Sequence, residues 1–202
     1  MTISAIPDMA QQAASYAVIG CWFLFALTFL LKKSPARVRE TKRDWTSLLG
    51  MFLQGVAFYC VWFRPGLWKQ FPSVKFESPV LAWGQAGLVV AIALFSVWLV
   101  NSAARQLGKQ WALAARLVEG HELIQDGPYR LVRNPIYTGM FGMLLATGLV
   151  MPRWIPLAIA ILVFVAGTYI RIQREERLLR QAFGPEFDAY ARRVPALIPG
   201  IY

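Results

Sequence analysis

The sequence predicts an all-α, polytopic helical membrane protein that forms a single membrane domain over residues 1–202. Of its residues 57% are hydrophobic and 16% are charged, and its mean hydropathy of +0.45 is too apolar for an ordinary soluble domain. Apolar runs of near-spanning length recur along the chain. We expect about five transmembrane helices: three N-terminal spans in residues 1–100, and a helical hairpin in residues 101–202 that is followed by a cytoplasmic helix and tail.

Three apolar runs make up the N-terminal half. We expect spans at Ala13–Leu31, Trp45–Phe63 and Pro79–Val100. Tryptophans near the ends of the second and third runs are typical of interfacial anchors. Cys21 and Cys60 lie inside apolar runs, so we expect buried, inert thiols rather than a disulfide or a metal site.

Two shorter apolar runs follow the polar segment Asn101–Asn134. They are Ile136–Val150 and Trp154–Ile170, with a tight turn at Met151-Pro152-Arg153. Each is a little short to cross a bilayer core of about 30 Å by itself. We therefore expect the two to pair as a helical hairpin.

A charged helix is expected at Arg171–Phe183, where Gly184-Pro185 ends it before the short tail Glu186–Tyr202. Glu176 shares an apolar stripe of this helix, and a carboxylate on such a stripe needs a partner or a ligand. Glu175 lies beside that stripe. Its simplest interpretation is a modest surface ion pair with Arg171 at i, i+4, and the alternative is a carboxylate directed into a site.

The distribution of basic residues predicts the orientation. Of the 21 Lys and Arg residues, 17 fall in alternate loops, and the positive-inside rule makes that side cytoplasmic. The N-terminus is then outside, and the polar segment and the C-terminal helix share the cytoplasmic face. The net charge of +10 is thereby attributed to topology and anionic lipid rather than to nucleic acid.

The stretch from His121 to Gly139 is the polar interruption with the most specific chemistry. Asn134-Pro135 stands where an apolar helix begins, because Asn can cap a helix and Pro is tolerated at its first position. The first-turn N–H groups would then be available to an anion. His121 alone is typical of a surface residue, and Arg130 and Arg133 alone are typical of lipid-headgroup contacts.

Several short motifs of the C-terminal half occur together in a fixed order. They are Leu107-Gly108-Lys109-Gln110-Trp111, His121-Glu122-Leu123, Gly127-Pro128-Tyr129, Arg133-Asn134-Pro135 with Tyr137 and Gly139, Arg171 with Glu175-Glu176, then Phe183-Gly184, Tyr190, Arg193-Val194-Pro195 and Pro199. In this order and spacing, residues 100–202 resemble the isoprenylcysteine carboxyl methyltransferase and phospholipid methyltransferase superfamily.

The resemblance implies a membrane-embedded methyltransferase that uses S-adenosyl-L-methionine, bound on the cytoplasmic side over the hairpin and under the C-terminal helix. The cofactor-binding positions that it implies are His121, Gly127, Tyr129, Arg133, Asn134, Pro135, Tyr137, Gly139, Glu175 and Glu176. The superfamily usually has His where this chain has Asn134. This departure leaves a capping or donor role at that position, but not one that needs an imidazole.

The catalytic candidates are Arg171, Arg193 and Glu176. A carboxylate acceptor is ionised at neutral pH and needs no base, but it needs a cation to hold it. An ammonium acceptor must first lose a proton, and Glu176 is the available base. We therefore expect a lipophilic acceptor that enters from the bilayer, with the carboxylate of an isoprenylcysteine-like substrate preferred and phosphatidylethanolamine as the alternative.

Sterol reductases that use NADPH are a second alternative, because they share a similar ending, Val194-Pro195 and Ile201-Tyr202 here. Glu175-Glu176 argues against this alternative, since sterol reductases tend to carry His and Arg-Asp pairs at the corresponding positions. With one histidine, no metal site is expected. The expected location is a bacterial or archaeal inner membrane, with the active site on the cytoplasmic face and with membrane lipids as partners.

Overall fold

The computed structural model describes residues 6–31, 40–43, 46–62, 76–108, 116–118, 122–151 and 153–200, which form helices and one two-stranded sheet. The helices are α1 (Ile6–Leu30), α2 (Ser47–Trp62), α3 (Pro79–Leu107), the 3-10 turn η4 (Gly127–Arg130), α4 (Pro135–Val150), α5 (Trp154–Phe183) and α6 (Pro185–Arg193). Strands β1 (Glu40–Arg43) and β2 (Arg116–Val118) pair antiparallel. Within these ranges, α1, α3 and α5 are long and apolar enough to cross a membrane, while α2 and α4 are shorter apolar helices. The predicted helical membrane protein is confirmed.

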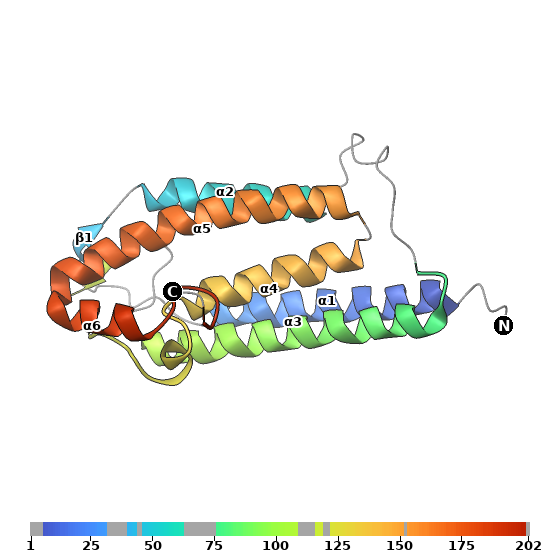
Figure 1. Cartoon of the computed structure of the whole chain (residues 1–202), viewed down its shortest axis with the longest axis horizontal. Coiled ribbons are helices and arrows are strands. Elements are labelled where there is room, and N and C mark those ends of the chain that lie inside the picture. The colour runs from blue at the N-terminus through green and yellow to red at the C-terminus, as the bar shows by residue number, and fades with distance from the viewer. Residues whose placement is uncertain are drawn as a thin grey trace.

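The long helices run side by side in two groups (Figure 1). In one group α1, α3 and α4 bury a core that includes Val18, Val89 and Met143. In the other, α2 lies along α5, and Ala57 and Phe164 pack with residues of α4. Helix α5 runs back antiparallel to α4, and α6 lies at one end of the molecule, beside the start of α4 (Figure 1).

Small residues bring the helix backbones close together at two crossings. A Cβ atom at Gly139 of α4 would lie 2.4 Å from Cγ2 of Val100 on α3. A Cβ atom at Gly50 of α2 would lie 2.5 Å from the carbonyl oxygen of Gly167 on α5. Glycine at such crossings is typical of helix pairs in membranes, where van der Waals packing drives association. The second crossing fixes α2 against the part of α5 that precedes its charged end.

Helix α4 ends inside the bundle, and neighbouring side chains satisfy its last carbonyl groups. Its 16 residues span about 24 Å, less than the core of a bilayer. Gln85 of α3 donates through Nε2 to the Leu149 carbonyl at 2.9 Å, and Gln11 of α1 donates to the Val150 carbonyl at 3.1 Å. Because unsatisfied carbonyl groups are costly in lipid, these two glutamines allow α4 to be short.

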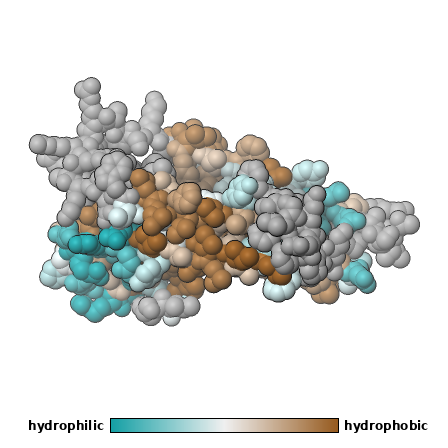
Figure 2. Space-filling view, turned by 90° about the horizontal axis from the view of Figure 1, so that it is seen from above, coloured by the Kyte–Doolittle hydropathy of each residue, from teal (hydrophilic) through white to brown (hydrophobic). Residues whose placement is uncertain are grey.

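Large apolar side chains cover the outside of the bundle. The most exposed, each at least 66% accessible, are Tyr16, Phe23, Leu30, Leu31, Phe52, Val80 and Leu162. Figure 2 shows hydrophobic residues across the middle of the molecule and hydrophilic residues towards both ends, with the larger group at one of them. An apolar surface of this extent is explained by contact with lipid.

The structure corrects three boundaries. Helix α3 continues past the expected end at Val100 to Leu107, because Ala103 and Ala104 are fully buried. Helix α1 begins at Ile6 rather than at the expected Ala13. Helix α5 runs without a break through Ile170 and Arg171 to Phe183, as the sequence predicts. The expected tail contains the additional helix α6, which is amphipathic and buries Phe187 and Tyr190. The sheet was not predicted.

Candidate functional site

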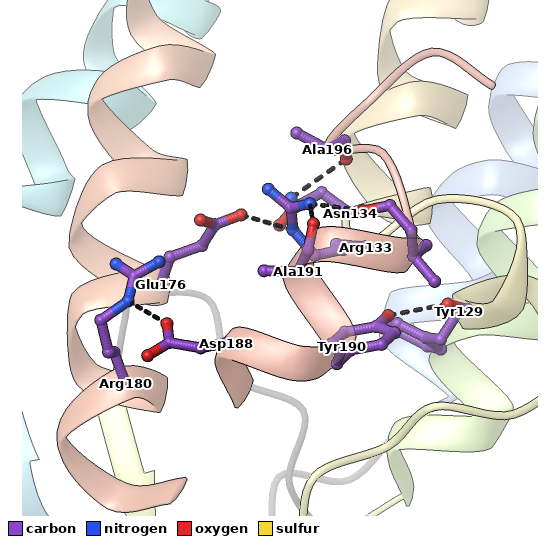
Figure 3. A network of polar contacts seen from close by, with 10 residues as sticks. Tyr129, Arg133, Asn134, Glu176, Arg180, Asp188, Tyr190, Ala191 and Ala196 are labelled. Carbon is purple, nitrogen blue, oxygen red and sulfur yellow. Dashed lines mark hydrogen bonds and ion pairs between the residues drawn. The ribbon is translucent and has the colours of Figure 1, made fainter. Parts of the chain in front are cut away.

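The candidate site lies where η4, the start of α4, the charged end of α5 and α6 converge (Figures 1 and 3). Glycine permits the turn that leads into it, since Gly127 has a φ of +61°. The start of α4 also suits the site, because Pro135 occupies the first helical position and is buried. The polar residues of four segments therefore meet at one end of the bundle.

Arg133 connects three of these segments. Its Nε donates to Oε1 of Glu176 on α5 at 2.9 Å, and the two side chains are only 13% and 12% exposed. Its Nη1 donates to the carbonyl oxygens of Ala191, at 2.9 Å, and of Val194. Figure 3 shows the guanidinium between Glu176 and the end of α6. Arg133 therefore links α6 to α5, through a largely buried ion pair with Glu176 on one side and hydrogen bonds to the end of α6 on the other.

Residues 195–197 run alongside the start of α4. The Arg133 N–H donates to the Pro195 carbonyl at 2.8 Å, and both the backbone N–H and Nδ2 of Asn134 donate to Ala196 at 3.1 Å. Asn134 stands at the N-cap position, but its side chain makes no capping bond. The predicted capping bond is thus wrong, because the side chain donates to the tail instead, and a role of Asn134 towards a cofactor stays a prediction.

The second carboxylate, Glu175, belongs to a separate cluster. The Tyr137 hydroxyl donates to Oε1 of Glu175, and Nη2 of Arg171 lies 3.6 Å from the same oxygen. The Arg171 guanidinium carbon is 4.9 Å from the centre of the Tyr137 ring. The expected i, i+4 ion pair is therefore present, but it does not lie at the surface, since the side chains of Arg171 and Glu175 are only 7% and 27% exposed. Arg171 is buried because α2 covers this face of α5.

Helix α2 contributes two contacts to this cluster that were not predicted from the sequence. Oε1 of Gln54 accepts a hydrogen bond from Nη1 of Arg171 at 3.2 Å, and Nε2 of Gln54 donates to Thr168 at 2.8 Å. Gln54 is 2% exposed. The signal that could have revealed it is a lone amide in an otherwise apolar run, since polar residues within spans usually face the bundle interior.

Two tyrosines connect η4 and α6. The Tyr190 hydroxyl donates to the Tyr129 carbonyl at 2.7 Å. Burial, and then the negative charge of Glu175, raises the pKa of the Tyr129 phenol above its ordinary value. Burial also raises the pKa of the Tyr190 phenol. The positive charge of Arg133 lowers this pKa by less, and the negative charge of Glu176 raises it further. Both phenols therefore stay neutral at physiological pH.

The remaining predicted residues are placed differently. His121 lies outside the described residues. Gly139 packs against α3, and its role towards a cofactor stays a prediction. Arg193 is exposed at the end of α6, where it donates to the Ala189 carbonyl and to Gln125. It is therefore not part of the buried cluster around Arg171.

The structure thus brings most of the predicted site together as two neighbouring groups on α5. Glu176 binds Arg133, and Glu175 binds Tyr137 and Arg171. In the ranges that the structure describes, no group of three or more His, Cys, Asp or Glu side chains is arranged to hold a metal ion. Carboxylates, guanidinium groups and an aromatic ring, all largely removed from solvent, therefore lie together at one end of the bundle.

Comparisons with known proteins relate this chain to one family. A model of the phospholipid methyltransferase family matches residues 85–186, about half of the chain, from α3 to the start of α6. The nickel-cobalt-cadmium resistance protein NccN of Alcaligenes xylosoxydans xylosoxydans is 31% identical over 67% of this chain and 64% of that protein. Protein-S-isoprenylcysteine O-methyltransferase of Schizosaccharomyces pombe is 32% identical over 50% of this chain and 44% of that protein.

A plant relative is similar over a shorter region. Protein-S-isoprenylcysteine O-methyltransferase B of Arabidopsis thaliana is 36% identical over 42% of this chain and 43% of that protein. The aligned part of the chain spans less than two thirds of the length of each of these relatives. The family match covers η4, α4 and α5, and so includes both glutamates and their partners Arg133, Tyr137 and Arg171. The chain belongs to the phospholipid methyltransferase family.

Proposed function

We propose that this chain is an integral-membrane methyltransferase that uses S-adenosyl-L-methionine and methylates a lipophilic acceptor carried in the bilayer. The preferred acceptor is the carboxylate of an isoprenylcysteine-like substrate. The observation that carries the proposal is the pair of consecutive glutamates on α5, each joined to an arginine, at the polar end of an apolar bundle. Family membership and the names of the isoprenylcysteine relatives support it.

The donor set of the site suits the cofactor. S-adenosyl-L-methionine carries an ammonium, a sulfonium, a carboxylate and ribose hydroxyls. The Glu175 and Glu176 carboxylates are suited to the ammonium or the hydroxyls, and the Tyr137 and Tyr129 rings are suited to the sulfonium or the adenine. Arg133 and Asn134 are already bonded to the tail and to Glu176, so they would shape the cofactor site chiefly by holding residues 194–197 over it.

The cofactor, when bound, supplies an activated methyl group, and the protein's task is to position the acceptor against it and to exclude water. Arg171 is the residue best placed to hold an acceptor carboxylate. Its guanidinium has five N–H donors, and burial strengthens its attraction for an anion. Glu175 and Tyr137 limit the directions in which it can move. The acceptor would enter laterally, with its apolar chain in the lipid.

Phosphatidylethanolamine is the alternative acceptor, and the description of the matching family favours it. In that case Glu175 or Glu176 would bind the ammonium and accept its proton. The buried ion pairs argue for the carboxylate, because Arg171 would repel an ammonium at the same place. An enzyme of the sterol-reductase type that uses NADPH remains a second alternative, which the identity of the bound cofactor distinguishes.

The orientation of the chain in the membrane is proposed from the distribution of its basic residues. Five crossings would place the N-terminus outside and the site on the cytoplasmic face of a bacterial or archaeal inner membrane. In Figure 1 α6 and the start of α1 lie at opposite ends of the bundle, as this orientation requires. Cysteine labelling from either side of sealed vesicles, at single cysteines placed in α6 and before α1, tests the orientation directly.

Cofactor binding is the first test. Calorimetry on the purified protein in lipid nanodiscs should show binding of S-adenosyl-L-methionine and none of NADPH. A membrane extract incubated with the protein and methyl-labelled cofactor should yield a labelled lipid-soluble species. Binding of NADPH without methyl transfer would refute the proposal and favour the reductase.

A further inference from the structure

The buried face of α2 carries one amide side chain directed at the site. Ser47, Gly50, Gln54, Ala57 and Val61 form this face against α5. Gln54 lies on α2, outside the residues 85–186 that match the family. The N-terminal half of the chain therefore reaches the site through a residue that the family match does not include.

Only one orientation of the Gln54 amide satisfies the hydrogen bonds of its neighbours. A guanidinium can only donate, so Gln54 must present Oε1 to Nη1 of Arg171, as the 3.2 Å contact shows. Its NH₂ group then faces Thr168, whose Oγ1 accepts at 2.8 Å. The hydroxyl of Thr168 thus fixes the orientation of the amide, and the amide fixes one edge of the guanidinium.

The stem of Arg171 is held as well as its head. A Cβ atom at Gly50 would lie 2.5 Å from Cγ of Arg171, so the arginine stem packs directly on the glycine. Beyond it the guanidinium lies over the Tyr137 ring and beside Glu175. Arginine is a flexible side chain, and a preorganised guanidinium loses less entropy when it binds an anion.

We propose that Gln54 is a positioning residue: it holds the Arg171 guanidinium in the direction from which it binds the carboxylate of the methyl acceptor. This inference rests on the proposed function and deepens it. Discrimination between a carboxylate and a neutral acceptor is then set partly by the N-terminal half of the chain, which would otherwise serve only as membrane spans. Gln54 acts through Arg171 and does not itself contact the acceptor.

The test compares two probes that differ only at the carboxyl group. The probes are N-acetyl-S-farnesylcysteine and its carboxamide, and the measurement is the Kd of each for the protein in nanodiscs. The wild-type protein should bind the acid more tightly than the amide. Gln54→Leu should reduce this preference about tenfold, because one hydrogen bond to a charged group is lost, and leave the amide affinity unchanged.

Two further variants make the test specific. Thr168→Val keeps the shape of the side chain and removes the acceptor that orients Gln54, so it should reduce the preference in the same direction but less. Gln85→Leu is the matched control, since Gln85 is also hydrogen-bonded within the bundle but contacts the Leu149 carbonyl at the other end of α4. It should leave the preference for the acid unchanged.

The outcomes separate the two proposals. If Gln54→Leu does not fold, Thr168→Val carries the test alone. An unchanged preference in the variants that fold, with methyl transfer to the acid intact in the wild type, overturns the role of Gln54 only. A wild-type protein that binds acid and amide equally, and that methylates neither, overturns the carboxyl acceptor of the proposed function and the role of Gln54 with it.

Discussion

Replacing Arg133 by methionine should loosen the C-terminal segments from α5. The change leaves Glu176 as a largely buried carboxylate without its cation, and it removes the donor to the carbonyls of Ala191 and Val194. Breaking a buried ion pair costs about 3–5 kcal/mol. Because the two side chains keep 13% and 12% exposure, we expect the lower end, about 3 kcal/mol, which lowers the Tm by about 6–12 °C in a chain of this size.

The same molecule provides a control at similar geometry. Arg180 and Asp188 are 2.8 Å apart, but their side chains are 50% and 43% exposed. Arg180→Met should therefore cost less than about 1 kcal/mol. Thermal unfolding of both variants, followed by tryptophan fluorescence in the same detergent, measures the difference. Equal shifts in Tm for the two variants would refute the argument that burial makes the Arg133 pair important.

Three other predictions concern packing and protonation. Gly50→Ala should destabilise the fold by about 1–3 kcal/mol, because its Cβ meets Arg171 and the Gly167 carbonyl, whereas Gly55→Ala meets nothing within 4 Å and should be neutral in the same melting assay. Tyr190→Phe should cost about 1 kcal/mol by removing the hydrogen bond to Tyr129, and a Tm equal to that of the wild type would contradict this. The raised pKa of both phenols means that the folded state keeps protons that the unfolded state releases, so stability should fall as the pH rises above about 10, and more steeply in the wild type than in Tyr190→Phe.

Much of the fold could be predicted because lipid imposes a simple rule on sequence. Apolar runs of near-spanning length form helices, so α2, α4 and the apolar part of α5 appear within a few residues of their predicted positions, while α1 begins earlier, at Ile6 rather than Ala13. Helix ends are harder to predict, since tertiary contacts extend them. The end of α3 at Leu107 depends on the burial of Ala103 and Ala104, which no local pattern reveals.

The candidate site was predictable only where its residues share a motif. Glu176 and Arg133 belong to separate motifs, and the sequence indicated that Glu176 needs a partner or a ligand without pairing it with Arg133. Gln54 escaped prediction because its contact with Arg171 joins residues 117 positions apart. Arg193 was chosen for its place in the tail, but α6 turns its side chain to the exposed surface.

The most direct measurement of the central claim follows the labelled methyl group into product. The purified protein is incubated with methyl-labelled S-adenosyl-L-methionine and either N-acetyl-S-farnesylcysteine or phosphatidylethanolamine, and the products are treated with mild alkali. We predict label on the farnesylcysteine, released as volatile methanol, at a rate nearly flat between about pH 6 and 9 because a carboxylate is already ionised. Alkali-stable label on phosphatidylethanolamine, formed at a rate that climbs with pH, would contradict the account.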